Sequence, residues 1–350
     1  MATKLVSSIF LAITSLSLTA GEINTETPIA VASQEASNEK EESVSLIPEF
    51  HGAIRPRWEI DTESGKSRFE VRYARFAIDG KLLPQLSYFF QVDFCDQGTF
   101  KVNDAYAKLG IAKGLTLQAG QFRMPFGTEP FMSPRNYVFA NRSFMGKLMC
   151  NYRKVGAKLT YTVPVSVPLT LEAGVFNTGG IGNHNTWNKS YAGSGKATLT
   201  LNEFKICGGV MDILPDKTRI MLYNIGTTWS HDNWRAAVEY MNEHYVDSSH
   251  KDAHSWVVWG DYGHDAKLGI FNHWSVQARY DGMSRQWSGV DDAEDNPGRH
   301  RITLGATLSY RYKKVYTDLM INYEKYHYFH RYEAPTGQAD KAVVELAIRF

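Results

Sequence analysis

Basic side chains recur at alternate positions in several stretches of this 350-residue chain. Arg55 and Arg57 are two residues apart, and Arg279 stands between the apolar residues Ala278 and Tyr280. A guanidinium stays charged and presents a planar set of donors that matches the oxygens of a phosphate. If such side chains line one face of a common wall, that face attracts anions and can hold them in a row of moderate sites.

Acidic side chains share that face. By the parity of the alternation, the basic residues on it are Arg55, Arg57, Arg72, Arg75, Lys154, Lys158, Arg235, Arg279, Arg301 and Arg311. The acidic residues of the same parity are Glu59, Glu70, Asp93, Glu172, Glu239, Asp318, Glu324 and Glu345. Because the two signs are mixed, two interpretations stay open: a wall that prefers anions, and a wall that is charged only to stay hydrated.

The elements that position these residues are predicted to be β-strands, because apolar and polar residues alternate with a period of two. Ile302, Leu304 and Ala306, for example, alternate with Thr303 and Gly305. About sixteen segments show this pattern, with rough spans of 50–60, 67–79, 83–96, 100–110, 115–123, 152–163, 168–177, 193–201, 203–213, 218–230, 233–247, 253–263, 267–282, 299–312, 314–326 and 340–350. Short connectors are expected at 79–81, 113–114, 202 and 313–314, and longer ones at 124–150, 178–192, 248–252, 283–298 and 327–339.

The first 48 residues differ from the rest. Lys4, an apolar run that ends at Leu18, and the small residues Ala20 and Gly21 have the layout of a secretory signal, so residues 1–21 are predicted to be a signal peptide. Residues 22–48 contain six glutamates and one lysine, and are predicted to form a disordered acidic linker. Residues 50–350 hold 36 basic and 30 acidic residues, although the whole chain has a formal charge of only +1. That near-neutral balance gives no argument for nucleic acid as a partner.

The remaining residues, 49–350, are predicted to form a transmembrane barrel. In hydrocarbon an unpaired backbone group costs several kcal/mol, so only helices and closed barrels span a membrane. No stretch after the signal is apolar enough for a spanning helix. A soluble β-sandwich would alternate in the same way, but the export signal and tryptophans near strand ends, such as Trp58 and Trp256, favour an outer-membrane barrel. The predicted fold class is therefore all-β, an antiparallel barrel of about sixteen strands around an aqueous lumen.

Several motifs occur in an order that resembles a known family. Arg-Tyr-Ala-Arg-Phe at 72–76 precedes Gln-Phe-Arg-Met-Pro-Phe-Gly at 121–127, and Tyr-Arg-Lys-Val-Gly at 152–156 and Gly-Val-Phe-Asn at 174–177 follow after a long segment. This order resembles the phosphate-selective porin O and P family. The resemblance implies a sixteen-stranded barrel, usually trimeric, whose third loop, here about 124–150, folds inward as the constriction. The terminal strand that ends at Phe350 resembles the signal read by the barrel-assembly machinery.

The resemblance also implies a function. We expect a porin of the bacterial outer membrane that lets small hydrophilic solutes diffuse passively, with a mild preference for anions such as phosphate. A general non-selective porin is the main alternative, and an outer-membrane barrel hydrolase is a weaker one. Expected partners are small anionic or polar solutes, outer-membrane lipid and lipopolysaccharide, the barrel-assembly machinery through Phe350, and two further copies in a homotrimer; no cofactor and no nucleic acid are expected. The residues expected to line the pore and bind anions are Arg123, Arg135, Arg142, Lys147 and Arg153 at or near the inward loop, with Arg55, Arg57, Arg72, Arg75, Lys158, Arg279 and Arg301 on the wall.

Other constellations give weaker signals. His244, His250 and His254 cluster around one connector, but their spacing on a loop does not make a metal site. An acidic run at 291–295 could bind Ca²⁺, although a solvated loop is the simpler interpretation. A hydrolase needs a nucleophile beside a base, and His273 with Ser275 is the one such pair at two-residue spacing on a predicted strand with a plausible orienting group. That pair is expected to face the lumen as wall lining.

Overall fold

A computed structural model describes residues 46–96, 98–129, 137–164, 168–183, 187, 189–290, 292–330 and 332–350. Sixteen strands form one sheet, which confirms the predicted all-β barrel. Their bounds are β1 (Glu49–Asp61), β2 (Ser67–Leu83), β3 (Leu86–Asp96), β4 (Thr99–Ala112), β5 (Leu115–Arg123), β6 (Arg153–Val163), β7 (Leu169–Phe176), β8 (Ala192–Leu201), β9 (Phe204–Ile213), β10 (Ile220–His231), β11 (Trp234–Tyr245), β12 (Ala253–His264), β13 (His273–Met283), β14 (Arg299–Tyr312), β15 (Val315–Tyr328) and β16 (Lys341–Arg349). The predicted signal peptide and most of the acidic linker lie outside the described residues.

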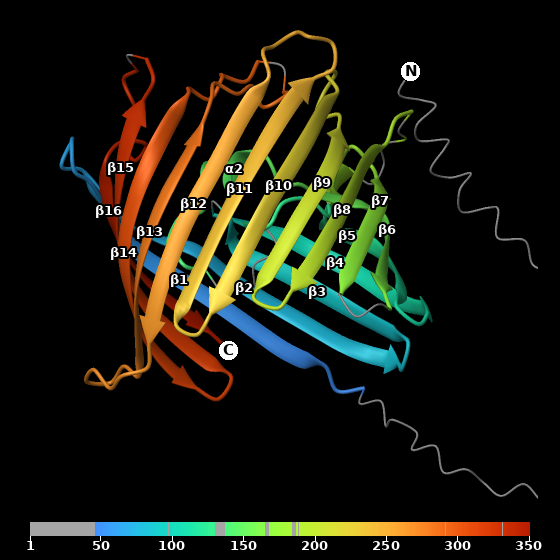
Figure 1. The fold of residues 1–350 in the computed structure, drawn as a ribbon, viewed down its shortest axis with the longest axis horizontal. Coiled ribbons are helices and arrows are strands. Elements are labelled where there is room, and N and C mark those ends of the chain that lie inside the picture. The colour runs from blue at the N-terminus through green and yellow to red at the C-terminus, as the bar shows by residue number, and fades with distance from the viewer. Residues whose placement is uncertain are drawn as a thin grey trace, which may run out of the picture. The chain divides into compact units, whose positions relative to one another are not determined.

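The sheet closes on itself (Figure 1). Each strand pairs antiparallel with its neighbours in sequence, and β1 pairs with β16 to complete the ring. The backbones of Gly52 and Phe350 exchange two hydrogen bonds of 2.9 and 3.1 Å at this seam. A Cβ at position 52 would overlap the Phe350 ring in its present position, so the glycine leaves room for this aromatic side chain. Closure matters because it leaves no edge with unpaired backbone groups.

Connections at one end of the barrel are mostly short, at 84–85, 113–114, 164–168, 202–203, 232–233, 265–272 and 313–314. Those at the other end include the long segments 124–152, 177–191, 284–298 and 329–340. Outer-membrane barrels place short turns in the periplasm and long loops outside the cell, which gives the two ends their names here: the turn end and the loop end.

The connector predicted at Asp79, Gly80 and Lys81 is wrong. These residues belong to β2, where Gly80 pairs with Tyr88 of β3, and the turn lies at Pro84 and Gln85. A Cβ on Gly80 would lie about 3 Å from the end of the Tyr88 side chain, so the glycine leaves room for this ring. A glycine that makes room for a cross-strand aromatic residue therefore looked like a turn signal. The start predicted at residue 267 is also wrong, since β13 begins at His273 after a longer connection.

Side chains alternate between the outer face and the lumen as the pattern requires. Ile302 and Leu304 are exposed on the outside, whereas Arg301 and Thr303 are buried inside. In β2 the parity changes at a bulge, because Ile54 pairs with Ala74 but Pro56 pairs with Val71. The extra residue lets Arg72 and Arg75, which have opposite parity, both line the same cavity.

The 124–152 connection, called loop 3 below, carries the short helix α2 (Phe144–Leu148), which contacts β12 and β13. A three-residue turn, η3 (Ile181–Asn183), lies in the next long connection. In Figure 1, α2 appears inside the ring of strands. No helix in the described part of the chain is long and apolar enough to cross a membrane.

Candidate ion pathway

Loop 3 crosses the lumen and hydrogen-bonds to inward side chains of distant strands. Arg279 donates to the Asn141 carbonyl at 2.8 Å, and Arg301 donates to the Arg142 carbonyl at 2.8 Å. The Phe144 amide donates to Asp281 at 3.0 Å. Arg55 lies on β1, across the β1–β16 seam from these strands, and donates to the Ala140 carbonyl at 3.0 Å. These bonds satisfy the backbone of a buried loop, which otherwise would be costly.

Apolar packing holds the other side of loop 3. Met145, Met149 and Cys150 are almost fully buried against inward residues of the β8–β12 wall. The wall residues in this cluster include Met211, Ile213, Ile220, Leu222 and Met241. These inward positions are apolar, although the lumen was predicted to be aqueous. The reason is that loop 3, not water, is their neighbour.

Three cavities follow one another along the open side of the lumen. The largest, about 660 Å³, lies at the loop end and is called the outer vestibule. Its charged lining residues are Arg57, Lys66, Arg68, Arg72, Arg142, Lys147, Arg299, Arg301 and Lys341, with Glu59, Asp61 and Glu70. Nine bases against three acids make it strongly positive.

The second cavity, about 130 Å³, is called the arginine pocket. Its charged lining residues are Arg55, Arg72, Arg75, Lys101, Arg123, Arg142 and Arg153, with Asp93. The third, about 460 Å³, lies at the turn end and is called the inner vestibule. Its charged lining residues are Arg235, Arg311 and Arg349, with Asp232, Asp261, Asp265 and Asp318. Arg72 and Arg142 line both the outer vestibule and the arginine pocket, and Tyr137 lines both the pocket and the inner vestibule.

Most acids inside the barrel are paired with bases. Glu345 bonds to Arg55, Asp93 lies 2.9 Å from Arg75, and Asp318 bonds to Arg349. Arg301 joins Asp281 at 2.9 Å to Glu324 at 3.1 Å. Seven of the eight acids expected on this face form such pairs, as Glu59, Glu70 and Glu172 also do. Glu239 instead accepts hydrogen bonds from Thr128 and Asn224. The mixture of signs on this face is therefore largely cancelled pair by pair.

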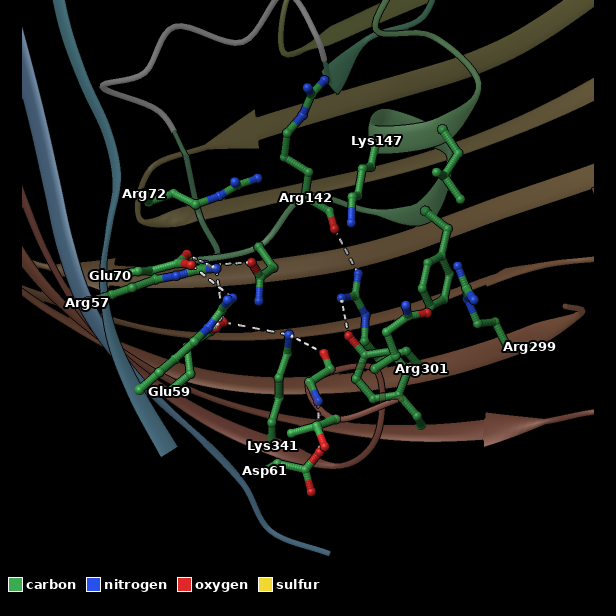
Figure 2. Close-up of a pocket in the computed structure, with 18 of the residues that line it drawn as sticks. Arg57, Glu59, Asp61, Glu70, Arg72, Arg142, Lys147, Arg299, Arg301 and Lys341 are labelled. Carbon is green, nitrogen blue, oxygen red and sulfur yellow. Dashed lines mark hydrogen bonds and ion pairs between the residues drawn. The ribbon is translucent and has the colours of Figure 1, made fainter. Parts of the chain in front are cut away.

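Five cations of the outer vestibule are left over, and one of them is Lys66, in the exposed connection after β1. Within the described residues, the other four, Arg72, Arg142, Lys147 and Arg299, also form no ion pair. Two nitrogens of the Arg142 guanidinium and two of the Arg299 guanidinium are buried without a hydrogen-bond partner in that part of the chain. Figure 2 shows dashed lines joining Arg57 to Glu59 and Glu70, whereas none reaches the side chains of Arg72 and Lys147.

The pKa values of two loop 3 residues, Lys147 and Tyr137, are shifted by the neighbouring cations. Burial inside the barrel and the neighbouring cations, Arg72 first among them, lower the pKa of Lys147. Burial opposes ionisation of Tyr137, but the guanidiniums of Arg123 and Arg142 outweigh it and lower the pKa of the phenol. Both shifts have the sign expected where cations outnumber acids.

The other predicted site residues fall into three groups. Arg123 and Arg153 line the arginine pocket, where Arg153 pairs with Asp104 at 3.0 Å. Lys158 pairs with Glu172 at 2.5 Å, and Lys154 donates to the Thr178 carbonyl. Arg235 and Arg311 line the inner vestibule. Arg135 lies outside the described residues.

Several lining residues were not predicted from the sequence, among them Lys66, Arg68 and Lys101. Arg299 and Lys341 line the outer vestibule, and both have the parity of neighbours that were included, Arg301 and Glu345. The alternation could therefore have found them at the first positions of their strands. Tyr137 sits in loop 3, and no pattern in the sequence points to it.

The weaker constellations do not converge. His244 bonds to Asp252 at 2.8 Å, and His250 stacks on Trp287 at 4.2 Å. Among the described residues, no group of three or more His, Cys, Asp or Glu is arranged to hold a metal. His273 bonds to Asp265 at 2.6 Å and lines the inner vestibule with Ser275, but the described contacts include no hydrogen bond between His273 and Ser275.

Comparison with known proteins agrees with this architecture. The family model described as phosphate-selective porin O and P matches residues 57–203, which confirms the predicted resemblance. No curated protein matches the chain.

Solved porin structures share the fold at low sequence identity. OmpF of Salmonella typhi, in a complex with daunomycin, has a TM-score of 0.59 at 15% identity, covering 87% of this chain and 97% of its own. An anion-selective porin from Comamonas acidovorans has a TM-score of 0.58 at 12% identity, covering 87% and 98%. A trimer form of OmpT, an outer membrane protein of Vibrio cholerae, has a TM-score of 0.57 at 11% identity, with the same coverage. The chain thus has the sixteen-stranded barrel fold of these porins, and its residues 57–203 match the model of the phosphate-selective porin O and P family.

Proposed function

We propose that this porin is a passive diffusion channel with a mild preference for small anions such as phosphate. The observation that carries the proposal is the set of four cations, Arg72, Arg142, Lys147 and Arg299, that meet in the outer vestibule without a carboxylate partner among the described residues. An unneutralised cluster raises the local concentration of anions, and low-dielectric walls strengthen this focusing. The paired acids nearby keep the preference mild, since they lower the field that a solute meets.

Conduction also needs release. A site that binds too tightly would block the pore, so several moderate sites in series serve transport better than one deep site. The outer vestibule and the arginine pocket share Arg72 and Arg142, and this sharing supports a handover of the anion from one cavity to the next. The matching family name and the anion-selective neighbour support the same class of solute.

Other parts of the proposal concern location and assembly. Residues 1–21 would direct export, and Phe350 would present the last strand to the barrel-assembly machinery. Lipid and lipopolysaccharide would surround the barrel. A homotrimer is supported by the trimer form of one structural neighbour. The channel would need no cofactor and catalyse no reaction.

The test is the reversal potential of the purified protein in a planar bilayer under a KCl gradient. We expect it to lie toward the chloride equilibrium potential, and the triple variant Arg72→Gln, Arg142→Gln, Lys147→Gln to move it toward zero. Lys113→Gln, in an exposed turn of the barrel, is the matched control and should change nothing. A reversal potential near zero in the unaltered protein would favour the general porin, and a shift toward the potassium potential would overturn the anion preference.

A further inference from the structure

The outer and inner vestibules differ in charge although loop 3 borders both. The outer vestibule has a surplus of six positive charges among its lining residues, and the inner vestibule has a surplus of one negative charge. Asp281 and Glu324 pair with Arg301 but do not line the outer vestibule. If these two acids are counted, the outer vestibule still has a surplus of four positive charges. The asymmetry therefore remains when these two carboxylates are counted.

We propose that this asymmetry makes the pore a rectifier, which conducts better when anions move from the loop end toward the turn end. The inference rests on the proposed channel function, but it concerns the direction of conduction and not the choice of ion. It follows from the order of the cavities along the lumen: positive vestibule, narrow arginine pocket, then a vestibule without positive surplus.

The physical reason is how each ion reaches the constriction. When the turn end is held positive, anions enter the constriction from the outer vestibule, where they are concentrated. Cations arrive from the inner vestibule and are repelled by the outer one, so both ions accumulate at the narrow point and the conductance rises. When the field is reversed, anions must come from a vestibule that does not concentrate them, and cations must come from one that excludes them. The constriction is then depleted of ions and the conductance falls.

Screening gives the effect a clear signature. The Debye length is about 10 Å at 0.1 M salt and about 3 Å at 1 M. At 0.1 M the field of the lining charges therefore reaches about three times as far into each vestibule as at 1 M. Rectification that arises from vestibule charge must therefore weaken as salt is raised, which distinguishes it from voltage-driven closure of a loop.

The experiment is single-channel recording in symmetric KCl, with the ratio of conductances at opposite voltages as the readout. The orientation of each channel is assigned with the variant Ser67→Cys, whose side chain lines the outer vestibule, and a negatively charged, membrane-impermeant thiol reagent applied from one side. Applying the same reagent to the unaltered protein shows whether the native cysteines react. We expect the larger conductance when the turn end is positive, at 0.1 M KCl, and a ratio near one at 1 M.

A charge change at the inner vestibule separates this proposal from the anion preference. Asp232 and Asp265 are exposed there, with side chains 81% and 84% accessible. The double variant Asp232→Lys, Asp265→Lys should lower the ratio at 0.1 M toward one, while the reversal potential under a gradient stays anion-selective or becomes more so. Glu203→Lys, in another turn at the same end but outside the vestibule lining, is the matched control and should keep the ratio.

A ratio of one at 0.1 M, a larger conductance in the opposite direction, an unchanged ratio at 1 M, or an unaltered ratio in the double variant would each overturn rectification by vestibule charge. None of these results would touch the anion preference, which the reversal potential measures separately.

Discussion

Antiparallel strands form both halves of the barrel interior, but the inward side chains of the two halves differ in type. On the β8–β12 side, inward residues such as Met211, Leu222 and Met241 pack against loop 3 and exclude water. On the side formed by β13–β16 with β1 and β2, inward residues such as Arg57, Arg301 and Glu324 form a charged wall. Loop 3 is therefore held by apolar contacts on one side and by hydrogen bonds on the other. The part of the lumen that loop 3 leaves open therefore lies beside the charged half.

The charged half itself has two kinds of cation. Arg55, Arg279 and Arg301 are bonded to carboxylates or to loop 3 carbonyls, so they position the constriction. Arg72 and Lys147 have no ion pair within the described residues and face the outer vestibule. Substitutions in the first group should therefore act on stability, and those in the second on selectivity.

The largest effect is expected from Arg301→Met. Arg301 is 3% exposed and bridges Asp281, Glu324 and the Arg142 carbonyl, so its loss leaves two buried carboxylates without their principal partner. Breaking a buried ion pair on one side costs about 3–5 kcal/mol. Urea unfolding in lipid vesicles, followed by tryptophan fluorescence, measures the change. Arg285→Met removes an exposed pair with Asp295 and should cost less than about 1 kcal/mol. Equal losses for the two variants would contradict the assignment of Arg301 to the positioning group.

The second prediction concerns the apolar half of the interior, where Met241→Ala removes a buried side chain. Met241 is fully buried in the cluster that holds loop 3, and a Cβ on Gly127 of the loop would come within 2.9 Å of its methyl group. Met241→Ala should destabilise the barrel by about 2–5 kcal/mol through the cavity it leaves. The same unfolding assay gives the loss, and single-channel recording should show noisier open levels with unchanged ion selectivity. A change of selectivity without a loss of stability would show that the two halves are not separate in function.

The smallest expected effect concerns the charged half and is the pH dependence of the anion preference. Because burial and the neighbouring cations lower the pKa of Lys147 from its ordinary value of 10.5, this lysine loses its proton at a lower pH than an ordinary lysine. The charge is present below the lowered pKa and disappears as the pH rises through it. The anion preference should therefore decline modestly with rising alkalinity, measured as reversal potential against pH. Lys147→Arg keeps its charge and should flatten the curve. A decline of the same size in that variant would assign the titration to another group.

Much of the barrel could be predicted from alternation. The strand β14 was expected at 299–312 and occupies Arg299–Tyr312, because a wall between lipid and water demands opposite residue types at neighbouring positions. The pattern misled at Gly80, where the glycine makes room for the Tyr88 ring and the strand continues to Leu83. It also misled on the inward face of β9 and β10, since the neighbour of Met211 and Leu222 is a loop from elsewhere in the chain.

The sequence alone establishes that apolar and polar residues alternate up to Phe350 and that bases exceed acids after residue 49. Local side-chain chemistry and a two-residue period are enough for that. Only the tertiary structure decided which arginines are neutralised and which remain available. The partners of Arg55 and Arg301 include Glu345 and Asp281, which lie 290 and 20 residues away in the chain. An ion pair depends on distance in space, and closure of the barrel together with the path of loop 3 sets that distance.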